Sequence, residues 1–201
     1  MGNIYGDLTV KSFYDIFGST YHNWDKLLCN NMLNKYKIDT SKKMSSLSVG
    51  QTAQVFFIFT ISQKARVLLL DEATSGLDPF VREEINSDLK QYVENNDVGV
   101  IYSSHIISDI ERVATRIILI KDGKLLLDES LDKLKSNYFI VDKVFLEEMK
   151  FTYKPIVKNE DKQYVVYVDD DLIQQNNLEK YRKSLEDTIF NLYGEKYDET
   201  I

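Results

Sequence analysis

The sequence predicts an α/β fold with a mostly parallel sheet. Two short apolar runs, residues 67–70 and 98–102, have the length and composition of buried strands, and a stretch with helical signals follows each of them. The order strand, helix, strand, helix, strand is typical of this fold class. The 201 residues are 43% hydrophobic and 28% charged, which is the composition of a globular chain of one domain with a small appendage.

The first part of the chain is predicted to be helical. Apolar residues recur at helical spacing between Leu8 and Phe17, and Asn23 is the expected N-cap of a second helix from Trp24 to Tyr36. A polar connector, residues 42–47, follows. Ser48 can then cap a helix that runs to about Ser62.

The middle of the chain alternates between strands and helices. The strand at 67–70 ends in Asp71-Glu72 and is expected to be buried on both faces. Asp78 and Pro79 are a typical N-cap and first residue of a helix, which should reach about residue 96. A second buried strand at 98–102 and a helix from about 107 to 114 complete this part.

A hairpin and a short tail follow. Residues 116–121 and 124–127 flank Asp122-Gly123, a strong signal for a two-residue hairpin turn. Further on, we expect a strand at 164–168, an acidic turn at 169–171 and an amphipathic helix at 178–193.

Charge and composition argue against several kinds of partner and covalent framework. The net charge of −7 argues against nucleic acid or anionic lipid as the main partner. The single cysteine, Cys29, excludes an intramolecular disulfide, fits a reducing cytoplasm and is expected to be a buried structural thiol. Residues 1–18 lack a signal-peptide pattern. The most apolar stretch, residues 55–61, is far shorter than the roughly 20 residues of a membrane helix, so we expect no direct membrane span.

Four short motifs occur in a fixed order. They are Leu-Ser-Val-Gly-Gln at 47–51, the apolar run with Asp-Glu at 67–72, Ser-Gly-Leu-Asp at 75–78, and His105. From Ser48 to Asp71 there are 23 residues (71 − 48), and from Asp71 to His105 there are 34 (105 − 71). In this order and spacing the chain resembles the ATP-binding cassette (ABC) ATPases, as signature motif, Walker B, D-loop and switch histidine.

The resemblance covers most of residues 8–138 and implies a partial P-loop NTPase (ABC ATPase) fold. It divides the chain into a remnant of the helical subdomain at 1–41, the ATPase core at 42–138, and a C-terminal extension at 139–201. The hairpin and the tail are similar to those of bacterial export-type ATPase subunits.

The carboxylates Asp71 and Glu72 carry the chemistry that can be stated from the residues. Asp71 follows a buried strand at the sheet edge where α/β proteins place their ligands, and a carboxylate there can hold Mg²⁺ through its water shell. Glu72 points differently and can polarise or deprotonate an attacking water. Taken alone, the pair could also be a solvated turn.

The signature residues Ser48, Val49, Gly50 and Gln51 open a helix, whose free N–H groups and dipole favour an anion. Gly50 lets the backbone approach a phosphate closely. Without the other motifs this would be an ordinary capped helix. The resemblance implies that the motif closes over the γ-phosphate of ATP held by a facing subunit, although Val49 stands where the family usually has glycine.

The remaining site residues take their roles from the resemblance. His105 is implied to contact the γ-phosphate and to help position the attacking water; without the motif order, a structural histidine would be the simpler interpretation. Asp78 has two compatible roles, as a helix cap and as a residue of the subunit interface. The implied cofactors are ATP and Mg²⁺.

One expected motif is missing from these 201 residues. Nowhere is there a G-x-x-x-x-G-K-[ST] loop, and the Gly123-Lys124 pair lies in the predicted hairpin. A parallel sheet without the P-loop strand and helix would leave apolar surface uncovered. Because the P-loop normally supplies most of the phosphate contacts, we expect this polypeptide alone to bind Mg-ATP poorly and to hydrolyse it negligibly.

The resemblance implies a truncated ATP-binding and ATP-hydrolysing subunit of an ABC transporter that powers a membrane permease. Its implied partners are a second ATPase subunit, in a homo- or heterodimer, and the permease, which would hold it at the inner face of the cell membrane. Two alternatives remain open: a non-catalytic partner that offers only the signature face to a complete subunit, and a gene remnant.

Overall fold

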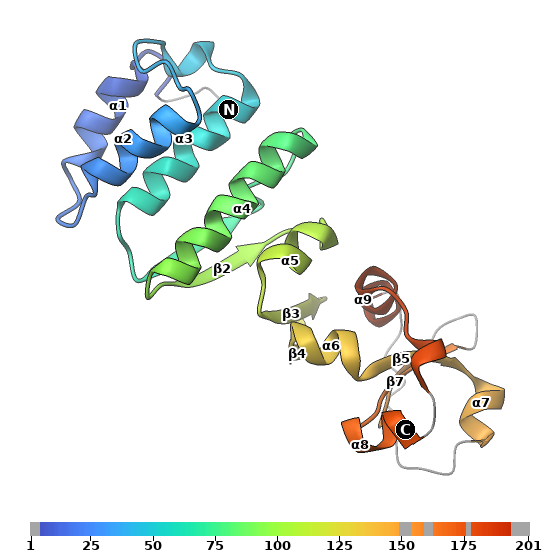
Figure 1. Cartoon of the computed structure of the whole chain (residues 1–201). Coiled ribbons are helices and arrows are strands. Elements are labelled where there is room, and N and C mark those ends of the chain that lie inside the picture. Colours follow the sequence, from blue (N-terminus) through green and yellow to red (C-terminus); the bar gives the residue numbers. More distant parts are fainter. Residues whose placement is uncertain (1–4, 149–153, 159–162, 176–177, 194–201) are drawn as a thin grey trace. The chain divides into compact units, whose positions relative to one another are not determined.

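The computed structural model describes residues 5–148, 154–158, 163–175 and 178–193. These residues divide into two compact units, with the boundary between residues 113 and 114 (Figure 1). The boundary at 113/114 places the predicted hairpin in the second unit. The three-part division at residues 41 and 138 rests on the family resemblance and stays a prediction. Within the described residues, no helix is long and apolar enough to cross a membrane.

The first unit begins with three helices, α1 (Val10–Gly18), α2 (Lys26–Lys35) and α3 (Val49–Ser62), and a 3₁₀ turn precedes α3 at Met44–Ser46. The predicted cap Asn23 is wrong, because Asp25 caps α2 by accepting from the Leu28 N–H at 2.9 Å. The Asp25 N–H donates to the Ser62 carbonyl and its carboxylate pairs with Lys64, so the end of α3 fixes where α2 begins.

The rest of the first unit contains β1 (Val67–Asp71), α4 (Pro79–Asn95), β2 (Gly99–Ser103) and α5 (Ile107–Val113). As predicted, β1 and β2 are parallel, and their register sets Asp71 beside Ser103. The predicted cap of α4 is confirmed, since Oδ1 of Asp78 accepts from the N–H groups of Phe80 and Val81.

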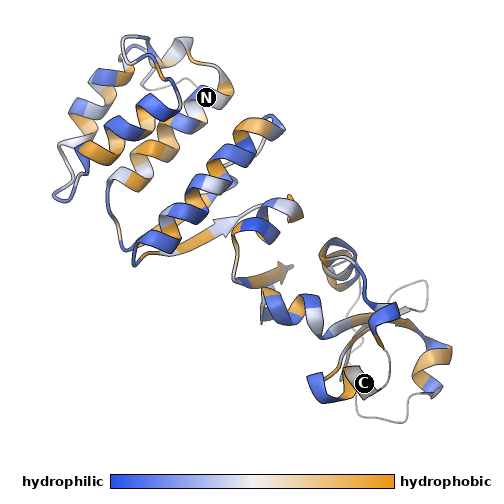
Figure 2. Ribbon diagram, viewed as in Figure 1, coloured by the Kyte–Doolittle hydropathy of each residue, from blue (hydrophilic) through white to orange (hydrophobic). Residues whose placement is uncertain are grey.

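A continuous apolar core joins the helices to one face of β1. Figure 2 shows α3 as a largely hydrophobic helix among its neighbours. Polar ties reinforce the packing: Gln54 of α3 donates to Glu84 of α4 at 2.9 Å, and Asp88 of α4 is held by Lys35 and the Tyr36 hydroxyl. The most buried side chains of this core are Val10, Met44, Val55, Ile58, Ile61 and Leu89.

The expectation that both strands are buried on both faces is wrong. Leu68 and Leu70 face the core, whereas Val67, Leu69 and Ile101 are 56%, 72% and 66% exposed. Within the described residues, nothing covers this second face of the β1–β2 pair. The predicted uncovered apolar surface is therefore present.

The second unit starts with the hairpin of β3 (Arg116–Lys121) and β4 (Lys124–Ser130). Its turn residues Asp122 and Gly123 have φ values of 49° and 74°, as a two-residue turn with both φ angles positive requires. This confirms the predicted hairpin.

A small α+β arrangement follows: α6 (Leu131–Ser136), β5 (Tyr138–Asp142), α7 (Lys143–Glu148), β6 (Lys154–Lys158), β7 (Gln163–Tyr167), α8 (Asp170–Gln175), a 3₁₀ turn (Leu178–Tyr181) and α9 (Leu185–Tyr193). The strands form an antiparallel sheet in the order β5-β7-β6, so the predicted strand near 164–168 is confirmed as β7. Phe139, Val166 and Leu178, all 0% exposed, lie in its core.

Two predictions for this tail are wrong. Asp170 and Asp171 lie in the first turn of α8, where carboxylates suit the helix dipole, and not in an acidic turn. The single helix expected at 178–193 is interrupted, because Ser184 caps α9 by accepting from the Asp187 N–H at 3.0 Å. Leu178, on the other side of the break, is packed in the core of the sheet.

Burial should make Cys29 unreactive in the folded chain. The side chain is 3% exposed, and burial raises the pKa of its thiol to about 11. At pH 8 we expect the native thiol to react with a disulfide reagent such as DTNB on the order of 100-fold more slowly than the thiol of the unfolded chain. Because this is the only cysteine, absorbance of the released thiolate reports it directly.

The sign of the accompanying pH effect follows from the raised pKa. The neutral thiol is favoured in the folded state, so its contribution to stability is complete below the thiol pKa of the unfolded chain. That contribution is lost as the pH rises towards about 11. Rapid reaction of the native chain at pH 8 would contradict the buried position.

Candidate functional site

The strand register brings together three predicted site residues, Asp71, Glu72 and His105. Asp71 ends β1, and Ser103 lies beside it at the end of β2. The Ser103 hydroxyl donates to Oδ1 of Asp71 at 2.6 Å and accepts from the Glu72 N–H at 2.9 Å. Ser103 was not among the predicted site residues. Its place in the Ser103-Ser104-His105 run after a strand was the signal that could have indicated it.

Glu72 has an unusual backbone conformation that directs its side chain. Its φ is 49°, in the left-handed region that costs a non-glycine residue about 1–3 kcal/mol. The Glu72 N–H to Ser103 and the Ser75 N–H to the Glu72 carbonyl, at 3.0 Å, hold this turn. The side chain reaches His105, with 2.8 Å between Oε2 of Glu72 and Nδ1 of His105.

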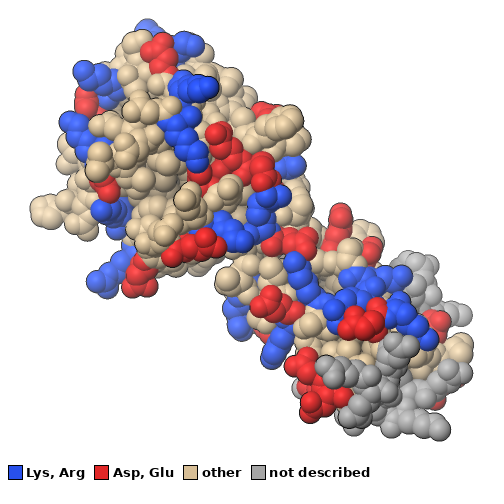
Figure 3. All heavy atoms as spheres, in the orientation of Figure 1, with Lys and Arg blue, Asp and Glu red and all other residues tan. Residues whose placement is uncertain are grey.

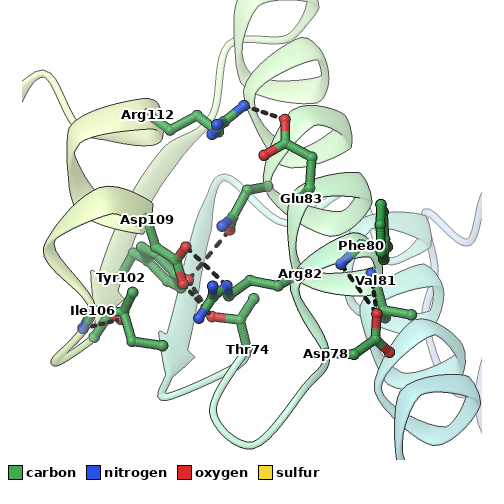
Figure 4. A network of polar contacts seen from close by, with 12 residues as sticks. Thr74, Asp78, Phe80, Val81, Arg82, Glu83, Tyr102, Ile106, Asp109 and Arg112 are labelled. Atoms are coloured by element: carbon green, nitrogen blue, oxygen red, sulfur yellow. Dashed lines mark hydrogen bonds and ion pairs between the residues drawn. The ribbon is translucent and has the colours of Figure 1, made fainter.

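A polar network surrounds the buried side chains of Thr74 and Asp109 (Figure 4). The Thr74 hydroxyl donates to Oδ2 of Asp109 at 2.9 Å and lies 2.7 Å from the Tyr102 hydroxyl. Nε of Arg82 is 3.5 Å from Oδ1 of Asp109. Burial raises the pKa of Tyr102, so its hydroxyl keeps its proton. Sequence analysis missed this network, since short-range patterns do not show that Asp109 is buried.

The signature residues form a second group at the start of α3. The Ser48 hydroxyl accepts from the Gln51 N–H at 3.1 Å, and the Gln51 side chain accepts from the Ser48 N–H at 3.3 Å, which is a complete capping box. The Ser48 hydroxyl proton stays available as a donor. Val49 is 70% exposed.

Close helix packing favours glycine at position 50, in addition to the predicted close approach of its backbone to a phosphate. A Cβ at this position would lie 3.3 Å from Cγ2 of Val81, so the starts of α3 and α4 approach each other closely here. Among the described residues, no hydrogen bond or ion pair links the signature residues or Asp78 to Asp71, Glu72 or His105. The first unit therefore presents two separate groups of predicted site residues. The cap role of Asp78 is seen directly, and its interface role stays a prediction.

The described residues offer one carboxylate for Mg²⁺ and one helix N-terminus for a phosphate. Within the described part of the chain, no three His, Cys, Asp or Glu side chains lie close enough together to hold a metal. Mg²⁺ in phosphate-handling sites is usually held by one or two carboxylates, waters and the phosphates themselves. Asp71 is exposed, and Ser103 orients one of its carboxylate oxygens, so Asp71 can serve as such a carboxylate ligand. The N-terminus of α3 suits an anion.

Curated proteins similar to this chain include ATP-binding proteins of transporters. The chain is 30% identical over 141 residues to the ABC transporter ATP-binding protein YtrB of Bacillus subtilis (strain 168), which covers 70% of this chain and 48% of YtrB. It is 31% identical over 119 residues to the energy-coupling factor transporter ATP-binding protein EcfA2 of Clostridium acetobutylicum, covering 59% and 42%. The chain thus spans about half or less of the length of these relatives. No family model matches it.

Solved structures agree on the fold. The structure of an ATP-binding subunit of an ABC transporter superposes with a TM-score of 0.56 at 17% sequence identity, covering 66% of this chain and 57% of that one. The predicted fold class is therefore confirmed, as part of an ABC ATPase fold.

Proposed function

We propose that this chain, a homologue of the ATP-binding proteins of ABC transporters, supplies the Walker B carboxylates, the switch histidine and the signature helix of an ATP-hydrolysing subunit that powers a membrane permease. One observation carries the proposal: Asp71, Ser103, Glu72 and His105 form a continuous hydrogen-bonded group at the carboxyl ends of two parallel strands. Ligands of α/β proteins bind at this edge of the sheet.

Each residue of the group has a distinct role in this function. Mg-ATP, when bound, supplies the γ-phosphoryl group as the electrophile. Asp71 would hold the metal, with Ser103 fixing the orientation of its carboxylate. Glu72 would orient the attacking water and accept its proton. His105, in contact with Glu72, would orient that carboxylate and contact the γ-phosphate.

The signature helix would act on a second nucleotide. The N–H groups at the start of α3 and the Ser48 hydroxyl would face the γ-phosphate held by a second ATPase subunit, either another copy of this chain or a different one. The permease would keep the assembly at the inner face of the membrane.

A second function is favoured by the exposed apolar face of β1 and β2. Val67, Leu69 and Ile101 lie open, and the 201 residues contain no P-loop motif. The chain would then offer only its signature helix to a complete subunit, and its own carboxylates would take no part in hydrolysis.

A fusion distinguishes the two functions. A segment of an ABC ATP-binding protein that carries the P-loop, for example from YtrB, is joined to the N-terminus of this chain. Mg²⁺-dependent phosphate release by the fusion supports the catalytic function. A folded fusion that binds Mg-ATP without hydrolysing it supports the non-catalytic one.

The 201-residue chain by itself should be nearly inactive. Without a P-loop it lacks most of the groups that cradle the phosphates, so we expect weak binding of Mg-ATP by calorimetry and phosphate release equal to that of its Glu72→Gln variant. Robust hydrolysis that Glu72→Gln abolishes would show that this expectation is wrong.

A further inference from the structure

Two segments that are far apart in the sequence, residues 72–74 and 105–109, are joined at two points. At the first, Glu72 and His105 are 2.8 Å apart, and their side chains are 41% and 67% exposed. At the second, the Thr74 hydroxyl donates to Asp109 at 2.9 Å, and these two residues are 1% and 4% exposed. Figure 4 shows Thr74 and Asp109 pointing towards each other between the loop before α4 and helix α5.

The buried contact should determine how the two segments sit relative to each other. An exposed pair such as Glu72 and His105 gains little in water, because solvent screens it and both side chains lose freedom. A buried hydrogen bond to a carboxylate is stronger, and breaking it leaves a buried oxygen without its donor. Beyond the bond from the Glu72 N–H to Ser103, the buried contact of Thr74 with Asp109 is thus better suited than the exposed pair to set the position of His105 relative to Glu72.

The hydrogen bonds around Thr74 have a defined direction. A carboxylate only accepts, so the single hydroxyl proton of Thr74 goes to Asp109, and the Tyr102 hydroxyl donates to Thr74 in turn. Asn86 is fully buried and lies 3.3 Å from the Tyr102 hydroxyl. Its Nδ2 has no acceptor within the described contacts, and turning the amide by 180° would let it donate to Tyr102.

The Asp109 carboxylate is also supported on its other oxygen. Nε of Arg82 in α4 lies 3.5 Å from Oδ1, so α4 supplies a positive charge to the carboxylate. Asp109 thus receives contacts from the loop after β1 and from α4, while it sits on α5, four residues after His105.

We propose that Thr74 and Asp109 are positioning residues that hold the Glu72 loop and the His105 loop in register through their buried hydrogen bond. The inference rests on the proposed function in one respect only, the roles given to Glu72 and His105. Neither positioning residue touches the reacting atoms.

The test uses the intact 201-residue chain and NMR of its two histidines, His22 and His105. In the unaltered chain, Glu72→Gln should move the ring resonances of His105 and leave those of His22 in place. Thr74→Val keeps the side-chain shape and removes the hydroxyl, so in that background the effect of Glu72→Gln on His105 should fall by about half or more. Thr74→Ser keeps the hydroxyl and should restore the full effect.

Specific results would overturn the proposal. One is an unchanged effect of Glu72→Gln in folded Thr74→Val, and another is no effect in the unaltered chain. If Thr74→Val only lowered stability, the midpoint of unfolding would fall, but the effect of Glu72→Gln on the His105 resonances would stay the same in the folded protein. If Thr74→Val does not fold, Asp109→Asn replaces it, with a weaker neutral acceptor and the same expected loss of coupling. An inactive P-loop fusion would instead count against the proposed function and leave this NMR result standing.

Discussion

Replacing Glu72 by glutamine in the P-loop fusion is expected to lower kcat for ATP hydrolysis by about 10²- to 10⁴-fold, with Mg-ATP binding retained. The glutamine amide has the size of the carboxylate but cannot accept a proton from the attacking water. The side chain is 41% exposed and its hydrogen bond is to His105, so the fold should tolerate the change. Phosphate release and nucleotide binding are measured on the same preparation.

Glu94→Gln is the matched control for this experiment. Glu94 is exposed on α4 and undergoes the same chemical change, so hydrolysis by the fusion should be unaffected. If Glu72→Gln changes kcat by less than about tenfold, Glu72 does not act as the general base. The role proposed for Glu72 would then be wrong, and another group would have to accept the proton of the attacking water.

Phe139→Ala should have the largest effect on the stability of the second unit. Phe139 is 0% exposed and packs with Val141, Val166 and Val168 in the core of the β5-β7-β6 sheet. Removing a buried phenyl ring loses its transfer free energy and leaves a cavity, which together cost about 3–5 kcal/mol. Denaturant unfolding followed by far-UV circular dichroism measures the change in the free energy of unfolding.

Phe190 offers the same substitution at an exposed position. It is 73% exposed on α9, so Phe190→Ala should change the free energy of unfolding by no more than about 0.5 kcal/mol. Equal effects of the two substitutions would contradict the core described for the second unit.

Features that are settled within a few residues could be predicted from the sequence. Ser48 and Asp78 cap their helices because the acceptor and the N–H groups that it satisfies lie two or three positions apart. Asp122-Gly123 forms its turn because both residues tolerate a positive φ. The order of the motifs likewise indicated the ABC ATPase fold, whereas the contact between Glu72 and His105 is known only from the structure.

Contacts between distant segments became known only from the folded structure. Asp25 caps α2 in place of Asn23 because its N–H reaches the end of α3. Ser103 serves Asp71 because the β1–β2 register pairs residues 32 positions apart. Asp109 is buried because Thr74 and Arg82 meet it there. The apolar run at 67–70 was expected to be covered on both faces. Which faces of β1 are covered depends on the neighbouring elements, and the local sequence pattern carries no information about these elements.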